Sequence, residues 1–199
     1  MDKNQIITEL VDTSHYIYKK GLVPGKSGNI SCRFYENGIS KVAITRSGIS
    51  KRNVELDDII IIDMDGNVLE GDKKPSMETF LHLEVYDKRK DINGIVHSHS
   101  PFATGFSMSN KKLKRLEGFG PIETPYIPYV KYSPPGSGEL AKDTAFMMKD
   151  NDAVILKNHG TVAAGVNLDE AALLAEFIED IAKIQYIANT LSLDSNKSI

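Results

Sequence analysis

The chain of 199 residues is 41% hydrophobic and 26% charged, with a formal net charge of −3 at pH 7, which is typical of one globular domain over residues 1–199. Its lysines and arginines are scattered along the sequence, which argues against a nucleic-acid partner. The strongest apolar run, at 59–62, is far shorter than a membrane-spanning segment, so we expect no membrane partner either.

The first half of the chain predicts one helix followed by paired strands. Apolar residues recur at helical spacing from Ile6 to Tyr18, and the pattern ends at Gly21. Two hairpins follow, each with a turn that contains Asn and Gly, and their strands are predicted at 29–34, 41–45, 58–64 and 68–69. We therefore expect antiparallel pairing in this half.

The only cysteine, Cys32, falls within the first of these strands. A single cysteine cannot form an internal disulfide, and in an alternating strand pattern its expected role is packing rather than reaction. The first residues contain no basic region that leads into a long apolar segment. Together these features predict a cytoplasmic protein.

Helices alternate with strands in the second half of the chain. Helices are predicted at 76–90, 139–149 and 169–191, and strands at 94–99, 153–157 and 161–166. The segment 100–124 shows no clear pattern. Two of the five histidines, His15 and His82, fall in predicted helices.

Three further histidines stand at the ends of two predicted strands and could bind one metal ion. His97 and His99 are two residues apart, so both side chains leave the same face of a strand. His159 precedes Gly160, where a strand gives way to a tight turn. Catalytic zinc takes three protein ligands and keeps a fourth position for water or substrate. A hydrogen-bonded histidine pair is the alternative, and the third imidazole disfavours it.

Three turns could approach an anion. The segment 24–29 contains Gly-Lys-Ser, but it lacks the spacing of a nucleotide-binding loop, because Lys20 stands where the leading glycine is required and a strand follows. A turn at Ser47-Gly48 and a helix start at Ser76 offer backbone N–H groups that suit phosphate. Each alone is typical of an ordinary turn or cap. Only their convergence in space makes a pocket.

Five motifs, taken in order, resemble those of the class II aldolase/adducin family. They are Gly28-Asn29-Ile30-Ser31, Thr45-Arg46-Ser47-Gly48, Pro75-Ser76-Met77-Glu78, His97-Ser98-His99 and Asn158-His159-Gly160. The resemblance extends roughly over residues 21–191. It implies an α/β fold with three layers, αβα, around a central and mostly antiparallel sheet. It also implies a homotetramer with active sites between subunits.

The resemblance further implies a zinc-dependent aldolase that reversibly cleaves a ketose 1-phosphate to dihydroxyacetone phosphate and a short aldehyde. By this resemblance His97, His99 and His159 bind Zn²⁺. Glu78 is the catalytic acid/base, and it also binds zinc when substrate is absent. The phosphate of the sugar substrate is held by Asn29, Ser47, Gly48 and Ser76. The residue types fit this chemistry, since a cation stabilises charge that develops beside a carbonyl, and an acid in the first turn of a helix stays ionised.

The sequence also departs from the family's pattern. No tyrosine occurs at 117–119, where the resemblance implies a catalytic tyrosine, nor in the tail 193–199. The candidate substitutes are Tyr126, Tyr129 and Tyr132. Met77 stands in place of a second phosphate-binding serine, for which Arg46 or Lys26 could compensate. The aldehyde specificity is therefore open.

Two other functions are weighed beside the aldolase. A sugar-phosphate epimerase or dehydratase of the same fold would use the same metal, but the resembling epimerases carry aspartate where Glu78 stands, although Glu117 could supply an acid. A metal-free interaction module, like the head of adducin, predicts that histidine ligands are lost. None is lost here.

Overall fold

The computed structural model describes residues 2–109, 111–116 and 124–195. The helices in these ranges are α1 (Lys3–Lys19), α2 (Thr79–Lys88), α3 (Pro101–Met108), α4 (Gly138–Met148) and α5 (Leu168–Ser195). The strands are β1 (Asn29–Glu36), β2 (Ile39–Thr45), β3 (Ile59–Ile62), β4 (Val68–Glu70), β5 (Gly94–Ser98), β6 (Tyr129–Val130), β7 (Ala153–Leu156) and β8 (Gly160–Gly165). Two short 3-10 turns, η1 (Lys51–Asn53) and η2 (Leu56–Asp58), precede β3.

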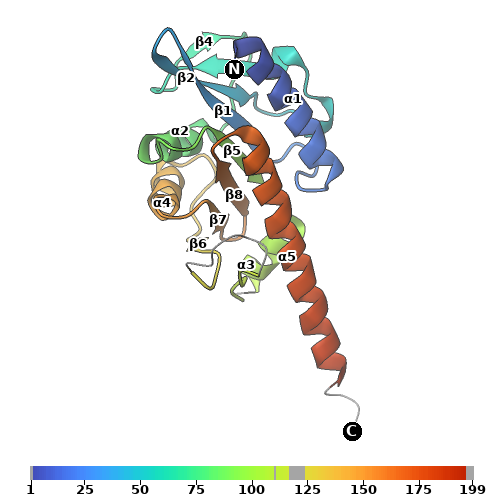
Figure 1. The fold of residues 1–199 in the computed structure, drawn as a ribbon. Helices are drawn as coiled ribbons and strands as arrows, with labels where there is room; N and C mark the ends of the chain where they lie inside the picture. Colours follow the sequence, from blue (N-terminus) through green and yellow to red (C-terminus); the bar gives the residue numbers. More distant parts are fainter. Residues whose placement is uncertain (1, 110, 117–123, 196–199) are drawn as a thin grey trace.

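All of these strands join one sheet in the order β4-β3-β2-β1-β5-β8-β7-β6, in which only the β6–β7 pair is parallel. Helices α1, α3 and α5 pack on one face, and α2 and α4 pack on the other (Figure 1). The predicted three-layer αβα arrangement with a mostly antiparallel sheet is therefore confirmed. Among the helices of the described ranges, none combines the length and apolarity needed to cross a membrane.

The sheet separates two hydrophobic cores, and β3 contributes to both. Ile59 and Ile61 belong to the core beneath α1 and α5, whereas Ile60 and Ile62 belong to the core beneath α2 and α4. A strand covered on both faces has a continuous apolar sequence instead of an alternating one. This covering explains the four consecutive isoleucines.

The first predicted hairpin is confirmed in its turn geometry. Glu36 pairs with Ile39, which leaves Asn37 and Gly38 as a two-residue loop. Both loop residues have positive φ, 52° and 78°, as a type I′ turn requires. The turn sets the register of β1 against β2, and β1 in turn pairs with β5, which carries His97.

Arg33 on β1 holds the end of α2 in place. Its guanidinium donates to the backbone carbonyls of Tyr86, Arg89 and Lys90 at 2.8, 3.1 and 3.0 Å, and to that of Ile92. The last carbonyls of a helix have no partner within the helix, so a buried cation can satisfy several of them at once. Arg33 therefore fixes α2 against the central strands.

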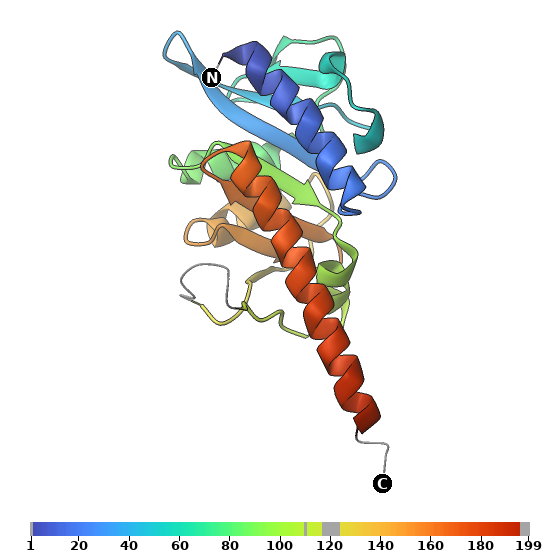
Figure 2. The same ribbon diagram turned by 45° about the vertical axis from the view of Figure 1, so that its right-hand side comes forward.

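Helix α5 crosses one face of the sheet and extends beyond it (Figure 2). Its buried Glu179 accepts hydrogen bonds from the backbone N–H groups of Phe102 and Ala103, in the first turn of α3. Burial raises the pKa of Glu179, while these two N–H groups favour the ionised form. The contact anchors the chain just after His99.

Several predicted boundaries shift in the structure. The helix predicted at 76–90 begins only at Thr79, so Glu78 takes the N-cap position instead of the first turn. The strand predicted to contain His99 ends one residue earlier, at Ser98. The unassigned segment 100–124 contains α3, which begins with Pro101 at its first position, a common helix start.

Candidate metal centre and active site

The three histidines of the sequence motifs meet at one end of the two central strands. His97 is the fourth residue of β5, His99 follows the end of that strand, and His159 precedes β8. Strands β5 and β8 are antiparallel neighbours, and Ser98 pairs with Thr161. The three ring centroids lie 4.8 to 5.0 Å apart. One potential ligand nitrogen from each ring lies within 4.8 Å of the others.

Backbone contacts orient the ring of His97 and fix the chain at the other two histidines. His97 Nδ1 donates to the carbonyl of Thr161 at 2.9 Å, which leaves the Nε2 lone pair free for a ligand. The backbone N–H of His99 donates to Leu22 at 2.9 Å. Next to His159, Gly160 approaches β5 so closely that a Cβ there would lie 2.1 Å from the carbonyl oxygen of Ser98. Glycine is therefore required at this position.

Glu78 joins the histidine cluster from the start of α2. Its Oε2 lies 3.1 Å from His97 Nε2, and its Oε1 lies 3.5 Å from His159 Nε2. Asn29, the first residue of β1, donates from its side-chain amide to Oε2 at 2.9 Å. The Glu78 side chain makes no cap hydrogen bond to its own helix. It is instead directed at the imidazoles.

The cluster has a distinct pattern of protonation. Burial raises the pKa of Glu78, but the charge of nearby His97 and the hydrogen bond from Asn29 outweigh burial and hold this pKa well below its ordinary value. Burial lowers the pKa of His97, yet the Glu78 carboxylate raises it above the usual value. Burial and the charge of His97 lower the pKa of His99 to about 3. The same two effects lower the pKa of His159 to about 4.

This set of side chains fits a divalent metal. His99 and His159 are neutral at pH 7, which is the form of imidazole that binds a cation. Within the described residues, three buried atoms of the cluster have no hydrogen-bond partner, namely Glu78 Oε1, His97 Nε2 and His159 Nδ1. Three imidazole nitrogens and one carboxylate oxygen are ligands that zinc accepts.

Two of the turns that the sequence proposed as anion sites, at 47–48 and at Ser76, lie together at the start of α2. Arg46 forms a β-bridge with Pro75, and the backbone N–H of Ser47 donates to Lys74 at 2.9 Å. Ser76 Oγ accepts from the backbone N–H of Glu78 at 3.2 Å. Gly48 has a φ of 71°, which favours glycine. The turn at 47–48 and the start of α2 are thus joined, with Asn29 reaching the same carboxylate.

The comparisons with known proteins agree with this geometry. The family described as Class II Aldolase and Adducin N-terminal domain matches residues 8–186. The chain belongs to the class II aldolase/adducin family. It is 37% identical to L-fuculose phosphate aldolase of Methanococcus maripaludis strain S2, covering 93% of this chain and 98% of the relative. It is 38% identical to 5-deoxy-D-ribulose 1-phosphate aldolase of Bacillus thuringiensis serovar kurstaki, covering 89% and 83%.

A solved structure of L-fuculose 1-phosphate aldolase superimposes with a TM-score of 0.87 at 32% identity, covering 96% of this chain and 89% of that one. Similarity of this extent identifies the chain as a lyase of the class II aldolase type, similar to the fuculose phosphate and deoxyribulose phosphate enzymes. Class II aldolases depend on a metal, and the histidine cluster is a possible site for it.

Within the described residues, none of the three tyrosines considered as substitutes for the family's catalytic tyrosine has a hydrogen bond or ring contact with the histidine cluster. Tyr129 donates to the carbonyl of Lys111, the ring of Tyr126 lies beside the ammonium of Lys112, and Tyr132 is exposed. The positions 117–119, where the family's catalytic tyrosine is expected, lie outside the described residues. Cys32 is buried, and burial raises the pKa of its thiol to about 12, in agreement with a packing role.

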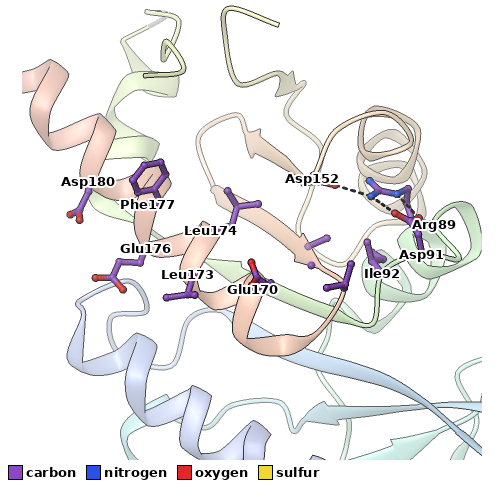
Figure 3. A pocket seen from close by; sticks show the side chains of 13 residues that line it. Arg89, Asp91, Ile92, Asp152, Glu170, Leu173, Leu174, Glu176, Phe177 and Asp180 are labelled. Carbon is purple, nitrogen blue, oxygen red and sulfur yellow. Dashed lines mark hydrogen bonds and ion pairs between the residues drawn. The ribbon is translucent and has the colours of Figure 1, made fainter. Parts of the chain in front are cut away.

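A surface hollow, drawn in Figure 3, is lined by none of the candidate site residues. Arg89 at its border forms ion pairs with Asp91 at 2.6 Å and Asp152 at 2.8 Å. The same guanidinium donates to the carbonyls of Met148 and Asn151. Because these contacts use its donors, Arg89 serves as a clamp between α2 and β7. The hollow is thus separate from the histidine cluster.

Sequence reasoning missed Lys51, a buried cation near the candidate site. Its side chain is 1% exposed, and its ammonium donates to the carbonyl of Ile49 at 3.2 Å. Its charge acts to lower the pKa values of His97 and His99. Burial, with a smaller contribution from the charge of Arg46, lowers the pKa of Lys51 from 10.5 to about 8.

We expect Lys51→Met to stabilise the protein at pH 7. The unfolded lysine keeps its proton between about pH 8 and 10.5, whereas the folded one loses it, so the wild-type free energy of unfolding rises across this window. The methionine variant has no such rise, and its advantage at pH 7 is roughly 3 kcal/mol at most. Urea denaturation at a series of pH values measures both effects, with exposed Lys142→Met as the matched control. Equal pH dependence in wild type and Lys51→Met would contradict the expectation.

Proposed function

We propose that this chain is a zinc-dependent aldolase that reversibly cleaves a ketose 1-phosphate to dihydroxyacetone phosphate and a short aldehyde. The observation that carries the proposal is the meeting of three imidazoles with the Glu78 carboxylate, where buried ligand atoms lack hydrogen-bond partners. The substrate class is supported by two relatives whose names contain fuculose phosphate and deoxyribulose 1-phosphate.

In this proposal His97, His99 and His159 hold the metal, and Glu78 completes the ligand set while substrate is absent. A bound zinc ion would supply a Lewis acid for the negative charge that develops at the substrate carbonyl oxygen. Glu78 takes and returns the proton at the carbon beside that carbonyl. When substrate displaces the carboxylate from the imidazoles that hold its pKa low, its proton affinity rises, as this role requires.

The substrate phosphate is proposed to bind Asn29, Ser47, Gly48 and Ser76. The turn at 47–48 and the start of α2 lie together. Arg46 and Lys73 share a single carboxylate, that of Asp58. Lys51 adds a third positive charge that has no acidic partner among the ion pairs of the described residues. A dianionic phosphate would balance this excess.

The proposal extends to the assembly and the location. A homotetramer with active sites between subunits needs apolar contact surface, and the C-terminal half of α5 exposes Ile184, Ile187 and Leu191 at a spacing that puts them on one helix face. The whole chain, 1–199, would act as one catalytic domain in the cytoplasm, where the single buried Cys32 stays reduced.

The deciding experiment is product analysis by NMR after incubation with a panel of ketose 1-phosphates, including those of L-fuculose and 5-deoxy-D-ribulose. We expect dihydroxyacetone phosphate and an aldehyde to appear, and both to vanish after treatment with a chelator. A new stereoisomer of the substrate would indicate an epimerase instead, and a product that has lost water would indicate a dehydratase. Turnover that is unaffected by chelation would overturn the metal-dependent proposal.

A further inference from the structure

His82 lies at the centre of a buried polar chain that ends at Glu78. It sits on α2 one turn after Glu78, is 0% exposed and uses both ring nitrogens. Its Nδ1 lies 2.6 Å from Ser31 Oγ, and its Nε2 is hydrogen-bonded to Oδ1 of Asn29. Asn29 is the residue that donates to the Glu78 carboxylate.

Two regular elements build this chain of side chains. Residues four apart on α2 share one helix face, and residues two apart on β1 share one strand face. The helix face carries Glu78, His82 and Tyr86, and the strand face carries Asn29 and Ser31. Tyr86 closes the far end, with its hydroxyl 2.9 Å from Ser31 Oγ and 3.2 Å from the carbonyl of Asn93.

The ionised carboxylate of Glu78 determines which group donates and which accepts in each of these hydrogen bonds. Ionised Glu78 can only accept, so Asn29 must present its amide nitrogen to Oε2, and its Oδ1 then faces His82. Because Oδ1 can only accept, His82 must carry its proton on Nε2. The Nδ1 lone pair therefore accepts from the hydroxyl of Ser31.

The reverse orientation of the Asn29 amide would place Oδ1 against the carboxylate of Glu78. Two oxygens without a proton between them repel each other, and in a buried site the repulsion is weakly screened. The N–H of His82 opposes this flip because it needs an acceptor. Burial and the charge of His97 lower the pKa of His82 to about 3, so a single N–H, and not two, is available at neutral pH.

We infer that His82 is a positioning residue, which locks the Asn29 amide so that it donates to the Glu78 carboxylate and holds that carboxylate in place beside His97 and His159. The inference rests on the proposed function, in which Glu78 moves the proton of the substrate. His82 touches neither the histidine cluster nor a substrate position. It acts only through Asn29.

Three substitutions separate positioning from packing. In His82→Gln the side-chain amide reaches about as far as Nε2 and keeps a donor for Asn29, whereas in His82→Asn the amide reaches only about as far as Nδ1, toward Ser31. His82→Leu keeps neither. We expect kcat for aldehyde release to fall about 10- to 100-fold in the Leu and Asn variants at unchanged metal content, and to recover largely in the Gln variant.

A purely structural role for His82 would instead reduce kcat in proportion to lost thermal stability in all three variants, and that result would overturn the inference. Equal kcat for wild type and His82→Leu would overturn it as well. If the wild-type enzyme releases no aldehyde from any ketose phosphate, the proposed function fails. The NMR measurement of the His82 tautomer then still tests whether His82 fixes the Asn29 amide.

The tautomer of His82 can be read without any activity. ¹⁵N NMR of the imidazole-labelled full-length protein at pH 7 should show a protonated Nε2 and an unprotonated Nδ1 for the signal that disappears in His82→Gln. A signal with the proton on Nδ1 would reverse the chain and refute the lock, whether or not the protein is an aldolase.

Discussion

Replacing Glu78 by glutamine should slow deuterium exchange into dihydroxyacetone phosphate by about two to four orders of magnitude while most of the metal remains bound. Glutamine has nearly the size of glutamate, but its neutral amide cannot take the proton from the substrate carbon. The three imidazoles that form the proposed site are untouched by the change. ¹H NMR in D₂O measures the exchange, and elemental analysis measures the metal.

The control for this variant is Glu84→Gln on the same helix. Glu84 is half-buried and belongs to neither the histidine cluster nor the hydrogen-bond chain from Asn29. The Glu84→Gln variant should catalyse deuterium exchange into dihydroxyacetone phosphate at the wild-type rate. Persistent exchange in Glu78→Gln, with metal still present, would remove Glu78 from the proposed role and direct attention to another base.

The position of Glu78 is consistent with the two roles proposed for its carboxylate, metal ligand and acid/base. As N-cap of α2 it lies at the positive end of a helix, and His97 and Asn29 add a charge and a hydrogen bond. These partners hold it ionised while it lies among the imidazoles.

The sequence predicted those parts of the fold that depend on local pattern. The turn at Asn37-Gly38 determines a hairpin by itself, because both residues accept positive φ. The run of four isoleucines could be recognised as a strand, but its burial on both faces depends on helices that come from distant parts of the chain. The parallel pair β6–β7 was not predicted, since β6 consists of only two residues, Tyr129 and Val130, which are too few to form a strand pattern.

In the candidate site too, local spacing could be predicted from the sequence, whereas contacts between distant segments could not. The spacing of His97 and His99 and the turn at His159 were readable, but their meeting depends on pairing between β5 and β8, more than sixty residues apart. His82 has the pattern of an ordinary buried helical residue, so only its contacts reveal its link to Asn29. The spacing of four residues from Glu78 was the one signal in the sequence that could have exposed it.

Changing His97 to asparagine should reduce the metal content from close to one divalent ion per chain to a small fraction of that value, and abolish turnover. The amide nitrogen of asparagine can still donate to the carbonyl of Thr161, as His97 Nδ1 does, but the Nε2 ligand is lost. Two imidazoles and a carboxylate then remain for the metal. Elemental analysis of purified protein gives the stoichiometry.

The same variant should also lose the stabilisation that metal binding gives the folded state. A ligand present at 100 times its dissociation constant adds about 2.7 kcal/mol to the free energy of unfolding, so chelation should lower the melting temperature of wild type but not of His97→Asn. His15→Asn is the matched control, because the ring of His15 is hydrogen-bonded to the carbonyl of Val54 and does not belong to the histidine cluster. Full metal content in His97→Asn would exclude the imidazoles as the ligand set, and so would a wild type that holds no metal after purification without chelators. The test is direct because the described ranges contain no other comparable group of three histidine, cysteine or acidic ligands.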